Sequence, residues 1–321
     1  MLKAAIIGCG DIAGGYDEKS RDNGLYSHAG AYQACGVKIA AVFDVNVSRA
    51  NAFAFHWGGK VCQSLEELYS GDEYDIVSVC TPDKTHHALI SGIMSAGKAR
   101  IVWAEKPLAV SSVEGKEMIA LANEKNIGLR VTYQRRWEQV HIDLAEKIKQ
   151  GLIGEVTAAR GYYVKGLIHI GTTMIDTLRF LIGEPEFAYP LSLINKGSYP
   201  DDSSTDIALV YPDGMTAVVQ GIDGSKYSYS LFELDILGTS GRVTITENGD
   251  YCEISRLAPY GHYDGFFSLK KELGEKTHMS VSMKNGLERM VKSFENGTWA
   301  DTTEAESALR NLVLAEQGRV V

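Results

Sequence analysis

The first third of the chain alternates apolar segments of strand length with segments of helical periodicity. Near-continuous apolar runs occupy residues 3–8, 38–44, 74–80 and 100–105, and such runs are typical of strands buried on both faces. The segments between them carry apolar residues at spacings of three and four, which predicts helices. Strands and helices that alternate in this way predict an α/β fold class, with a doubly wound parallel sheet.

The pattern changes near residue 133. A long helical segment at 137–151 is followed by strands and turns with alternating polar and apolar positions, as in 206–222 and 229–246. These runs predict an α+β second domain with a large, mostly antiparallel open sheet, on which a helix-rich C-terminal tail packs. The expected domains are therefore residues 1–132 and 133–321.

A helix is predicted from Leu167 to Gly183, and it carries polar residues in its interior. Its apolar face is expected to pack on the core and consists of Ile170, Met174, Leu178 and Leu181. His169, Thr173 and Asp176 form a polar stripe about a quarter turn away, which predicts the wall of a cleft. A glycine inside a helix is about 1 kcal/mol less favourable than alanine, so something is expected to pack close to the backbone at Gly171.

Composition excludes several classes of partner. The net charge of −9 and the pI near 5.4 argue against nucleic acid, because phosphate binding needs a cationic surface. The five cysteines lack any C-x-x-C pair, so they are expected to be reduced apolar fillers rather than disulfides or metal ligands. The N-terminal apolar run is too short for a signal peptide, and no 18-residue apolar stretch occurs. We therefore expect a cytoplasmic protein that binds no membrane and no metal.

The sequence GCGDIA directly follows the first predicted strand and has the pattern G-x-G-x-x-A. Gly8, Gly10 and Ala13 supply its fixed positions, with Asp11 and Ile12 between them. Glycines at these positions let the backbone turn tightly and approach a pyrophosphate at a helix N-terminus. The five residues therefore form a candidate dinucleotide-binding turn.

Asp44 ends the second predicted strand. A carboxylate there can bind both ribose hydroxyls of NAD and repel a 2′-phosphate, which favours NAD over NADP. Asp44 lies further from Gly10 than the usual spacing of roughly 20 residues. The polar, glycine-bearing loop expected at residues 14–28 accounts for the excess, either as a solvated surface insertion or as a lid over the cofactor.

Two further motifs follow the fourth and fifth strands, where open α/β sheets bind ligands. In AEKP, Lys106 precedes Pro107, so the backbone is extended and the lysine can donate a hydrogen bond to a substrate oxygen. A salt bridge between Lys106 and the neighbouring Glu105 is the structural alternative. In CTPDKTHHA, His86 and His87 open a helix, where an imidazole can cap the helix or contact a ligand.

The order and spacing of GCGDIA, CTPDKTHHALI, AEKPLAVS, YQRRW and IGEV resemble the Gfo/Idh/MocA oxidoreductase family along nearly the full chain. The resemblance implies an N-terminal Rossmann domain, a C-terminal domain whose sheet builds dimers or tetramers, and hydride exchange between NAD(P) and a sugar or cyclitol carbon. It also implies roles for individual residues: Gly8, Gly10 and Ala13 at the pyrophosphate, Asp44 at the adenosine ribose, Thr81, Pro82 and His86 near the nicotinamide, Glu105 in support, Lys106 with Pro107 at the reacting centre, and Arg136 at the edge of the active site.

The chain departs from the family at its next motif, D-x-G-x-H-x-x-D. The corresponding residues are His169, Gly171, Thr173 and Asp176, so histidine replaces the first aspartate and threonine replaces the catalytic histidine. Threonine cannot accept a proton near neutral pH, whereas His169 can. We hypothesise that His169 is a displaced general acid/base; the alternative is a core or interface histidine in a protein without turnover.

The predicted function is NAD-dependent hydride exchange with a hydroxyl-bearing carbon of a sugar, cyclitol or nucleotide sugar. The residues expected to bind substrate are Lys106, Arg136, Tyr163, His169, Thr173 and Asp176, with Tyr162 and Lys165 as further candidates. Two alternatives stay open: an NAD-binding sensor without catalysis, and NAD-dependent cleavage of glycosides. The expected partners are a small sugar-type molecule and further copies of the chain in a homodimer or homotetramer.

Overall fold

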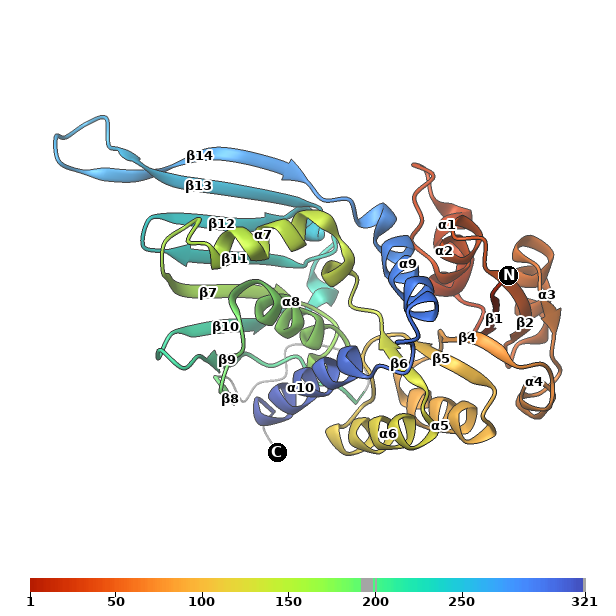
Figure 1. The fold of residues 1–321 in the computed structure, drawn as a ribbon. Helices are drawn as coiled ribbons and strands as arrows, with labels where there is room; N and C mark the ends of the chain where they lie inside the picture. The colour runs from red at the N-terminus through yellow and green to blue at the C-terminus, as the bar shows by residue number, and fades with distance from the viewer. Residues whose placement is uncertain (192–198, 200, 320–321) are drawn as a thin grey trace. The chain divides into compact units, whose positions relative to one another are not determined.

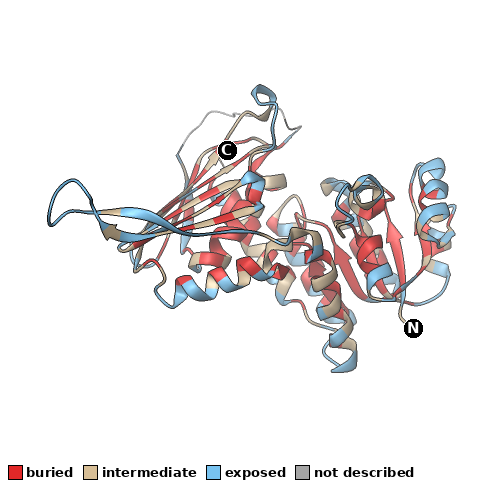
Figure 2. Cartoon of the chain, turned by 90° about the horizontal axis from the view of Figure 1, so that it is seen from above, coloured by how far each residue is buried: buried red, intermediate tan, exposed pale blue. Residues whose placement is uncertain are grey.

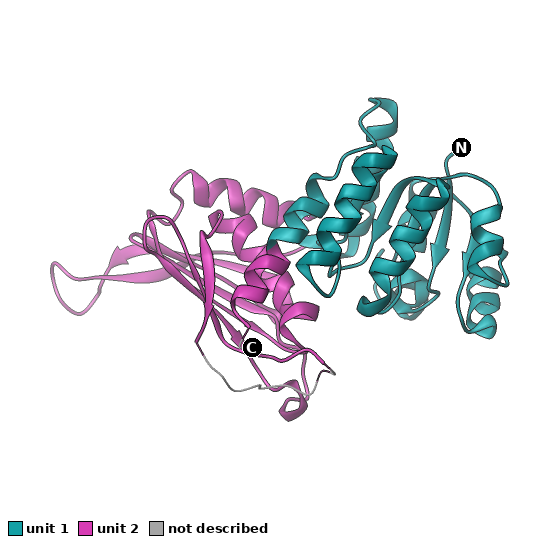
Figure 3. Ribbon diagram, turned by 90° about the horizontal axis from the view of Figure 1, so that it is seen from below, with its two compact units in different colours: residues 1–137, 279–310 teal, residues 138–278, 311–321 magenta. Residues whose placement is uncertain are grey.

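The computed structural model describes residues 1–191, 199 and 201–319. The chain divides into two compact units, shown in Figure 3. Unit 1 contains residues 1–137 and 279–310, and unit 2 contains residues 138–278 and 311–321. Neither unit is a single continuous segment, because the chain leaves unit 1 after Trp137, returns at Met279 and leaves again after Arg310. The predicted functional boundary between residues 132 and 133 stays a prediction.

Unit 1 is built on a six-stranded parallel sheet, which confirms the predicted doubly wound fold. The strand order is β3-β2-β1-β4-β5-β6. The strands are β1 (Lys3–Ile7), β2 (Lys38–Phe43), β3 (Lys60–Val61), β4 (Tyr74–Val79), β5 (Ala99–Ala104) and β6 (Gly128–Val131). The order reverses between β1 and β4, so the chain segments that follow these two strands lie at the switch point of the sheet.

Helices cover both faces of this sheet, with α2 and α9 on one side and α5 and α6 on the other (Figure 1). The helices of unit 1 are α1 (Tyr16–Lys19), α2 (His28–Ala34), α3 (Val47–Trp57), α4 (Leu65–Ser70), α5 (His86–Ala96), α6 (Ser112–Lys125) and α9 (Ser282–Glu295). Short turns lie at η1 (Asp11–Gly15), η2 (Asp83–Thr85), η3 (Gln134–Trp137) and η7 (Met279–Val281). Ser27, Ser64 and Ser111 begin α2, α4 and α6 by accepting a backbone N–H with their hydroxyl groups.

The expected loop at residues 14–28 is partly helical, which corrects the sequence analysis. The π-helical turn η1 starts directly after Gly10, and α1 continues it to Lys19. Irregular chain then leads to α2, which begins at His28. The polar composition of the segment conceals this helix, because α1 has no buried residue and therefore no apolar stripe.

Unit 2 contains an eight-stranded sheet in the order β14-β13-β12-β11-β7-β10-β9-β8. The strands are β7 (Val156–Tyr163), β8 (Phe187–Pro190), β9 (Ile207–Val210), β10 (Thr216–Gly221), β11 (Glu233–Gly238), β12 (Gly241–Thr246), β13 (Tyr251–Pro259) and β14 (Phe267–Lys276). Only the pair β7 and β10 is parallel among these described strands. The predicted large, mostly antiparallel sheet is therefore confirmed.

Helices α7 (Gln139–Lys149) and α8 (Thr172–Ile182) pack on one face of this sheet (Figure 1). Helix α10 (Thr303–Gln317) begins in unit 1 and ends in unit 2, and the short turns η5 (Gly224–Lys226) and η6 (Glu247–Gly249) lie between strands. The helix predicted at 167–183 is present, but its first turn, η4 (Leu167–Gly171), is a π-helix. Its apolar face is largely buried as expected, because Met174, Leu178 and Leu181 are at most 3% exposed.

The core of unit 1 joins residues that are distant in sequence. Trp103 of β5 contacts Tyr32 of α2 edge to face and Trp137 of η3 at 6.2 Å between ring centroids. Met283 and Leu287 of α9 belong to the same buried cluster. Buried residues line the facing sides of helices and sheets in both units (Figure 2). Helix α9 is therefore an integral part of the dinucleotide-binding unit, although it follows the second sheet in sequence.

Candidate active site

The glycine turn after β1 has the geometry of a cofactor cradle. Gly8 has φ of +88°, and a Cβ atom there would lie 2.6 Å from the carbonyl oxygen of Cys80. Gly10, by contrast, has no heavy atom within 4 Å of an added Cβ, so the backbone there is open to a ligand. Ala13 is fully buried. The turn thus combines close packing on β4 with an open face where a pyrophosphate group can approach the backbone.

Asp44 anchors this turn as well as ending β2. One oxygen, Oδ2, accepts the backbone N–H of Cys9 at 2.8 Å, and Oδ1 accepts that of Asn46 at 2.7 Å. The guanidinium of Arg49 lies 3.4 Å from Oδ2 and is about half exposed. Burial, followed by the charge of Asp44, raises the pKa of the Cys9 thiol to about 12. This cysteine stays protonated, and all five cysteines are free thiols, as expected.

His86 ties the two motifs at the ends of β4 and β5 together. Its ring is fully buried, with Nε2 2.9 Å from the carbonyl oxygen of Thr81 and Nδ1 2.7 Å from that of Pro107. The Lys106–Pro107 peptide bond is cis. Both ring nitrogens face carbonyl acceptors, and because a neutral imidazole carries one N–H, the ring donates to one of these two carbonyls at a time. The expected capping role is therefore replaced by a bridge between the two strand ends.

Glu105 and Lys106 follow β5, beside the switch point. Burial acts to raise the pKa of Glu105, but a hydrogen bond from His28, the charge of the His28 imidazole when it is protonated and the positive charge of Lys106 outweigh it, so the pKa lies below its ordinary value. The carboxylate is therefore ionised. His28, whose Nε2 lies 3.0 Å from Glu105 Oε1, was not singled out by sequence reasoning. Its partner is 77 residues away, so no local motif signals the contact.

His169 lies in the π-helical turn η4 of unit 2. The carboxylate of Asp202 accepts the backbone N–H groups of Ile168 and His169, the latter at 2.8 Å. Arg319 donates to the other oxygen of Asp202 at 2.8 Å. The imidazole of His169 stacks on Tyr199, with 4.5 Å between ring centroids and an angle of 13°. These contacts hold the turn that carries His169, and sequence reasoning found neither partner because both come from a distant loop.

Thr173 differs from the neighbouring threonines of α8. Thr172 and Thr177 donate their hydroxyl hydrogens to backbone carbonyls one turn earlier, as threonines in helices commonly do. The hydroxyl of Thr173 is buried and makes no hydrogen bond within the part of the chain that the structure describes. A buried hydroxyl without a partner carries a free-energy cost of about 1–3 kcal/mol. Thr173 is therefore the polar group of the stripe that is best suited to a hydrogen bond with a ligand.

The remaining predicted substrate residues are held by protein contacts. Asp176 is 1% exposed and accepts the side-chain amide of Asn311 at 2.9 Å. The hydroxyl of Tyr163 donates to the carbonyl of Thr205 at 2.7 Å. The close packing expected at Gly171 comes from Leu167 and Tyr163, since an added Cβ would lie 2.8 and 3.2 Å from them. Arg136 is half-buried in η3, and its carbonyl accepts Arg289 at 3.2 Å. Their roles toward substrate stay predictions.

An open hollow of about 610 Å³ lies beside the glycine turn, within unit 1. It is lined by Ile12, Tyr16, Lys19, Ser20, Arg21, Asp22, Tyr26 and Gln134. Most of these residues belong to segment 14–28. Two acids of that segment are engaged within it: Asp22 accepts from Ser20, Tyr26 and Gly24, while Asp17 accepts from Tyr26 and Ser27. The segment thus forms an ordered wall of the hollow.

Within 1–191, 199 and 201–319, no group of three or more histidine, cysteine or acidic side chains could hold a metal ion. No helix described in those ranges has the length and apolar character needed to cross a membrane.

The parallel sheet, the glycine turn at its switch point and the second sheet define a two-unit NAD(P)-binding oxidoreductase. Residues 2–133 match the family model described as "Oxidoreductase family, NAD-binding Rossmann fold". Residues 2–133 thus carry the NAD-binding Rossmann fold of the Gfo/Idh/MocA oxidoreductase family, as the resemblance indicated.

The similar proteins include dehydrogenases named for D-apiose and for inositol. The chain is 23% identical to D-apiose dehydrogenase from Paraburkholderia graminis over 78% of this chain and 68% of that protein. It is 27% identical to inositol 2-dehydrogenase from Rhizobium meliloti over 64% of this chain and 67% of that one. A crystal structure of KijD10, a 3-ketoreductase from Actinomadura kijaniata in complex with TDP-benzene and NADP, superposes with a TM-score of 0.76 at 19% identity, covering 98% and 96% of the two chains. This last likeness concerns the fold alone.

Proposed function

We propose that the protein is an NAD-dependent dehydrogenase that acts on a hydroxyl-bearing carbon of a sugar, cyclitol or nucleotide sugar. One observation carries the proposal. The glycine turn after β1, the Thr81–Pro82 motif after β4 and Lys106 after β5 all follow the carboxyl ends of adjacent parallel strands. This edge of an open α/β sheet is where such folds bind their ligands. A cofactor turn and a cationic donor at the same edge suit hydride exchange.

The residues of the chain have separate tasks in this reaction. The bound nicotinamide supplies the hydride acceptor. Lys106 donates a hydrogen bond to the substrate oxygen and stabilises the negative charge that develops on it. His169, in its neutral form, accepts the hydroxyl proton. Thr173 hydrogen-bonds a substrate hydroxyl with the group that has no partner in the described protein.

A sensor that binds NAD without turnover is the second candidate, and the replacement of the family histidine by Thr173 favours it. Incubation with NAD and a panel of sugars, sugar acids, cyclitols and nucleotide sugars separates the two, because only an enzyme increases the absorbance of reduced cofactor. Analysis of the products also detects cleavage of glycosidic bonds. Cofactor binding without reduction, on every member of the panel, would favour the sensor.

Lys106→Met tests the central role of the lysine. Turnover should fall by at least 100-fold, since loss of a charged donor to a developing oxyanion removes roughly 3 kcal/mol of transition-state stabilisation. Cofactor affinity should stay within a few-fold, as measured by fluorescence titration. An exposed lysine of the same unit, Lys38, supplies a matched control in Lys38→Met. Unchanged turnover in the Lys106 variant would remove this lysine from the mechanism.

A further inference from the structure

A buried chain of hydrogen bonds ends at Glu105, next to Lys106. His28 is fully buried at the start of α2, and both of its ring nitrogens have partners. Nδ1 lies 2.9 Å from the hydroxyl of Ser78, and Nε2 lies 3.0 Å from Glu105. The hydroxyl of Tyr32 lies 2.6 Å from the same serine oxygen. The chain therefore runs through Tyr32, Ser78, His28 and Glu105, all within unit 1.

The direction of these hydrogen bonds follows from the chemistry at the two ends. Glu105 is ionised, so it can only accept, and His28 must carry its proton on Nε2. At the other end, burial raises the pKa of Tyr32 well above its ordinary value, so the phenol keeps its proton and donates to Ser78. Ser78 then donates its own hydrogen to Nδ1. Every group is satisfied when His28 is neutral, whereas with a charged imidazole Ser78 Oγ would accept from both His28 and Tyr32, and the Ser78 hydrogen would have no acceptor in the described chain.

The surroundings hold the imidazole rigidly. The ring of His28 lies on Trp103, with 3.9 Å between the centroids, and Trp103 is itself fully buried in β5. The hydroxyl of Thr132 lies beside both the carbonyl of Ala104, at 3.0 Å, and the Glu105 carboxylate, and its single hydrogen serves one of these two acceptors at a time. A carboxylate with these contacts has a fixed place in a site of low polarity, where a neighbouring charge is felt strongly.

We propose that His28 is a positioning residue of the active site: its Nε2–H orients the Glu105 carboxylate, and the negative charge of that carboxylate acts on the adjoining Lys106 ammonium, which is to meet the substrate oxygen. The expected effect on turnover rests on the proposed function, whereas the hydrogen-bonded arrangement does not. Without the imidazole, burial favours the uncharged acid at Glu105. The negative charge next to Lys106 is then lost, which favours the deprotonated amine.

Trace acetylation of the full-length protein by acetic anhydride, read out by mass spectrometry of the Lys106 peptide, tests this without any substrate. His28→Leu should raise the labelling rate of Lys106 at least threefold at pH 8. His28→Gln, which restores a donor toward Glu105, should return the rate toward that of the wild type. His56→Leu replaces an exposed histidine of the same unit and should leave the rate unchanged. Lys38 serves as an internal standard in each sample.

A second measurement keeps the proposal testable if His28→Leu does not fold. Ser78→Ala removes the donor to Nδ1 and leaves the imidazole less firmly held, so labelling of Lys106 should again rise, while the ¹⁵N spectrum of the His28 ring should keep the Nε2-protonated form that Glu105 fixes. Where turnover is measurable, His28→Leu should lower kcat at least tenfold with little change in cofactor Kd. Folded variants in which Lys106 labels at the wild-type rate would overturn the proposal. An inactive wild type with the predicted labelling pattern would overturn only the proposed function.

Discussion

One carboxylate, Asp44, both shapes the glycine turn and faces the place expected for the adenosine ribose. It binds the backbone N–H groups of Cys9 and Asn46, and it also attracts Arg49. A cation so close to the acid bears on the prediction that Asp44 favours NAD over NADP. The carboxylate opposes a 2′-phosphate, while Arg49 is available to bind one when the carboxylate charge is removed.

We therefore expect NAD to bind more tightly than NADP, and Asp44→Asn to shift the ratio of the two Kd values at least tenfold toward NADP. The asparagine keeps only one of the two oxygen acceptors of the turn, so the ratio of the two Kd values, rather than their absolute size, reports the loss of charge. Fluorescence titration with both cofactors measures the ratio. In Asp44→Asn/Arg49→Gln the gain for NADP should disappear. Tighter binding of NADP by the wild type would contradict the role of Asp44.

The pH dependence of oxidation distinguishes His169 from Thr173. Only a neutral imidazole can take a proton, so the rate should rise with pH through a single ionisation. His169→Ala should lower the rate about 100-fold and flatten this rise. Thr173→Ala should mainly raise KM, since a hydroxyl can bond a sugar but does not titrate in this range. Full activity and an unchanged pH profile in His169→Ala would exclude the displaced histidine.

At the scale of single residues, the sequence reveals those functional residues that belong to a recognisable local motif. Lys106 is recognisable because it precedes Pro107 at the end of an apolar strand, and Asp44 because it ends another. His28 and Asp202 are not recognisable, because their partners are 77 and 33 residues away and only the fold brings them together. Thr173 was identified as a departure from a motif, but its buried hydroxyl without a partner is visible only in three dimensions.

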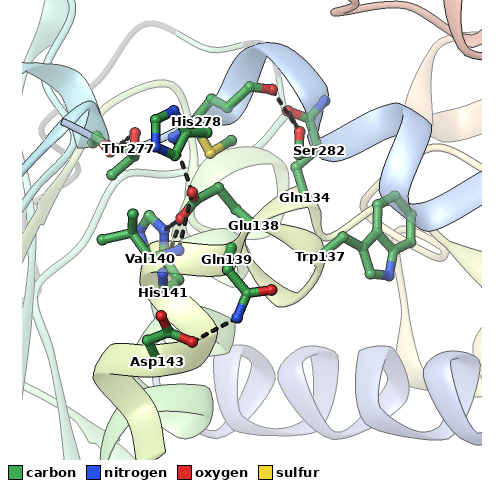
Figure 4. A network of polar contacts seen from close by, with 12 residues as sticks. Gln134, Trp137, Glu138, Gln139, Val140, His141, Asp143, Thr277, His278 and Ser282 are labelled. Carbon is green, nitrogen blue, oxygen red and sulfur yellow. Dashed lines mark hydrogen bonds and ion pairs between the residues drawn. The ribbon is translucent and has the colours of Figure 1, made fainter. Parts of the chain in front are cut away.

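Among the helices, α7 begins with a buried acid that serves as its N-cap. Glu138 accepts the backbone N–H groups of Val140, His141 and His278 at 2.9–3.1 Å, and Nδ1 of His141 at 2.6 Å (Figure 4). Its side chain is fully buried. Burial acts to raise the pKa of Glu138, but these hydrogen bonds outweigh it and lower the pKa from 4.5 to about 2.

A lowered pKa in the folded protein means that the carboxylate stabilises the fold above pH 4.5 and that this contribution is lost as the pH falls toward 2. Glu138→Gln should therefore cost about 1–3 kcal/mol of unfolding free energy near pH 7 and make stability depend less on pH between 4.5 and 2. Urea unfolding at several pH values measures both effects. Glu146→Gln, on the exposed side of the same helix, is the control. If the unfolding free energy of wild type and Glu138→Gln depended on pH in the same way, the lowered pKa of Glu138 would be refuted.

Helices and strands were predicted correctly where buried and exposed positions follow a regular pattern along the sequence. The strands β1, β2, β4 and β5 are apolar on both faces, so their sequences indicate a parallel sheet directly. Helix α1 has no buried residue, and the polar, glycine-bearing segment around it indicated a loop. The π-helical turn η4 was also missed, since a wider turn leaves no signature in a pattern of period 3.6.

For the molecule as a whole, we predict self-association, and the second sheet indicates which surface takes part in it. Its open face carries ion pairs such as Asp235–Arg242 at 2.6 Å, whereas the β13–β14 hairpin exposes Leu257, Phe266 and Phe267 by more than half. Exposed apolar clusters of this kind mark interaction surfaces. We expect a dimer or tetramer in light scattering at micromolar concentration. Phe266→Ser/Phe267→Ser should weaken it, while Phe55→Ser, on unit 1, should not. A monomeric wild type would contradict this expectation.

The interrupted path of the chain has a consequence for its synthesis. Met283, Leu287 and Met290 of α9 complete the core around Trp103 and Trp137, but a ribosome reaches them only after it has made the whole second sheet. At about 5–20 residues per second, the cofactor-binding unit waits roughly 10–30 seconds between the emergence of β6 and that of α9. During this interval the apolar side chains that α9 buries in the finished protein are exposed to solvent. Early binding of the cofactor to the growing chain is therefore disfavoured, and chaperones that shield apolar surface have their main opportunity in this interval.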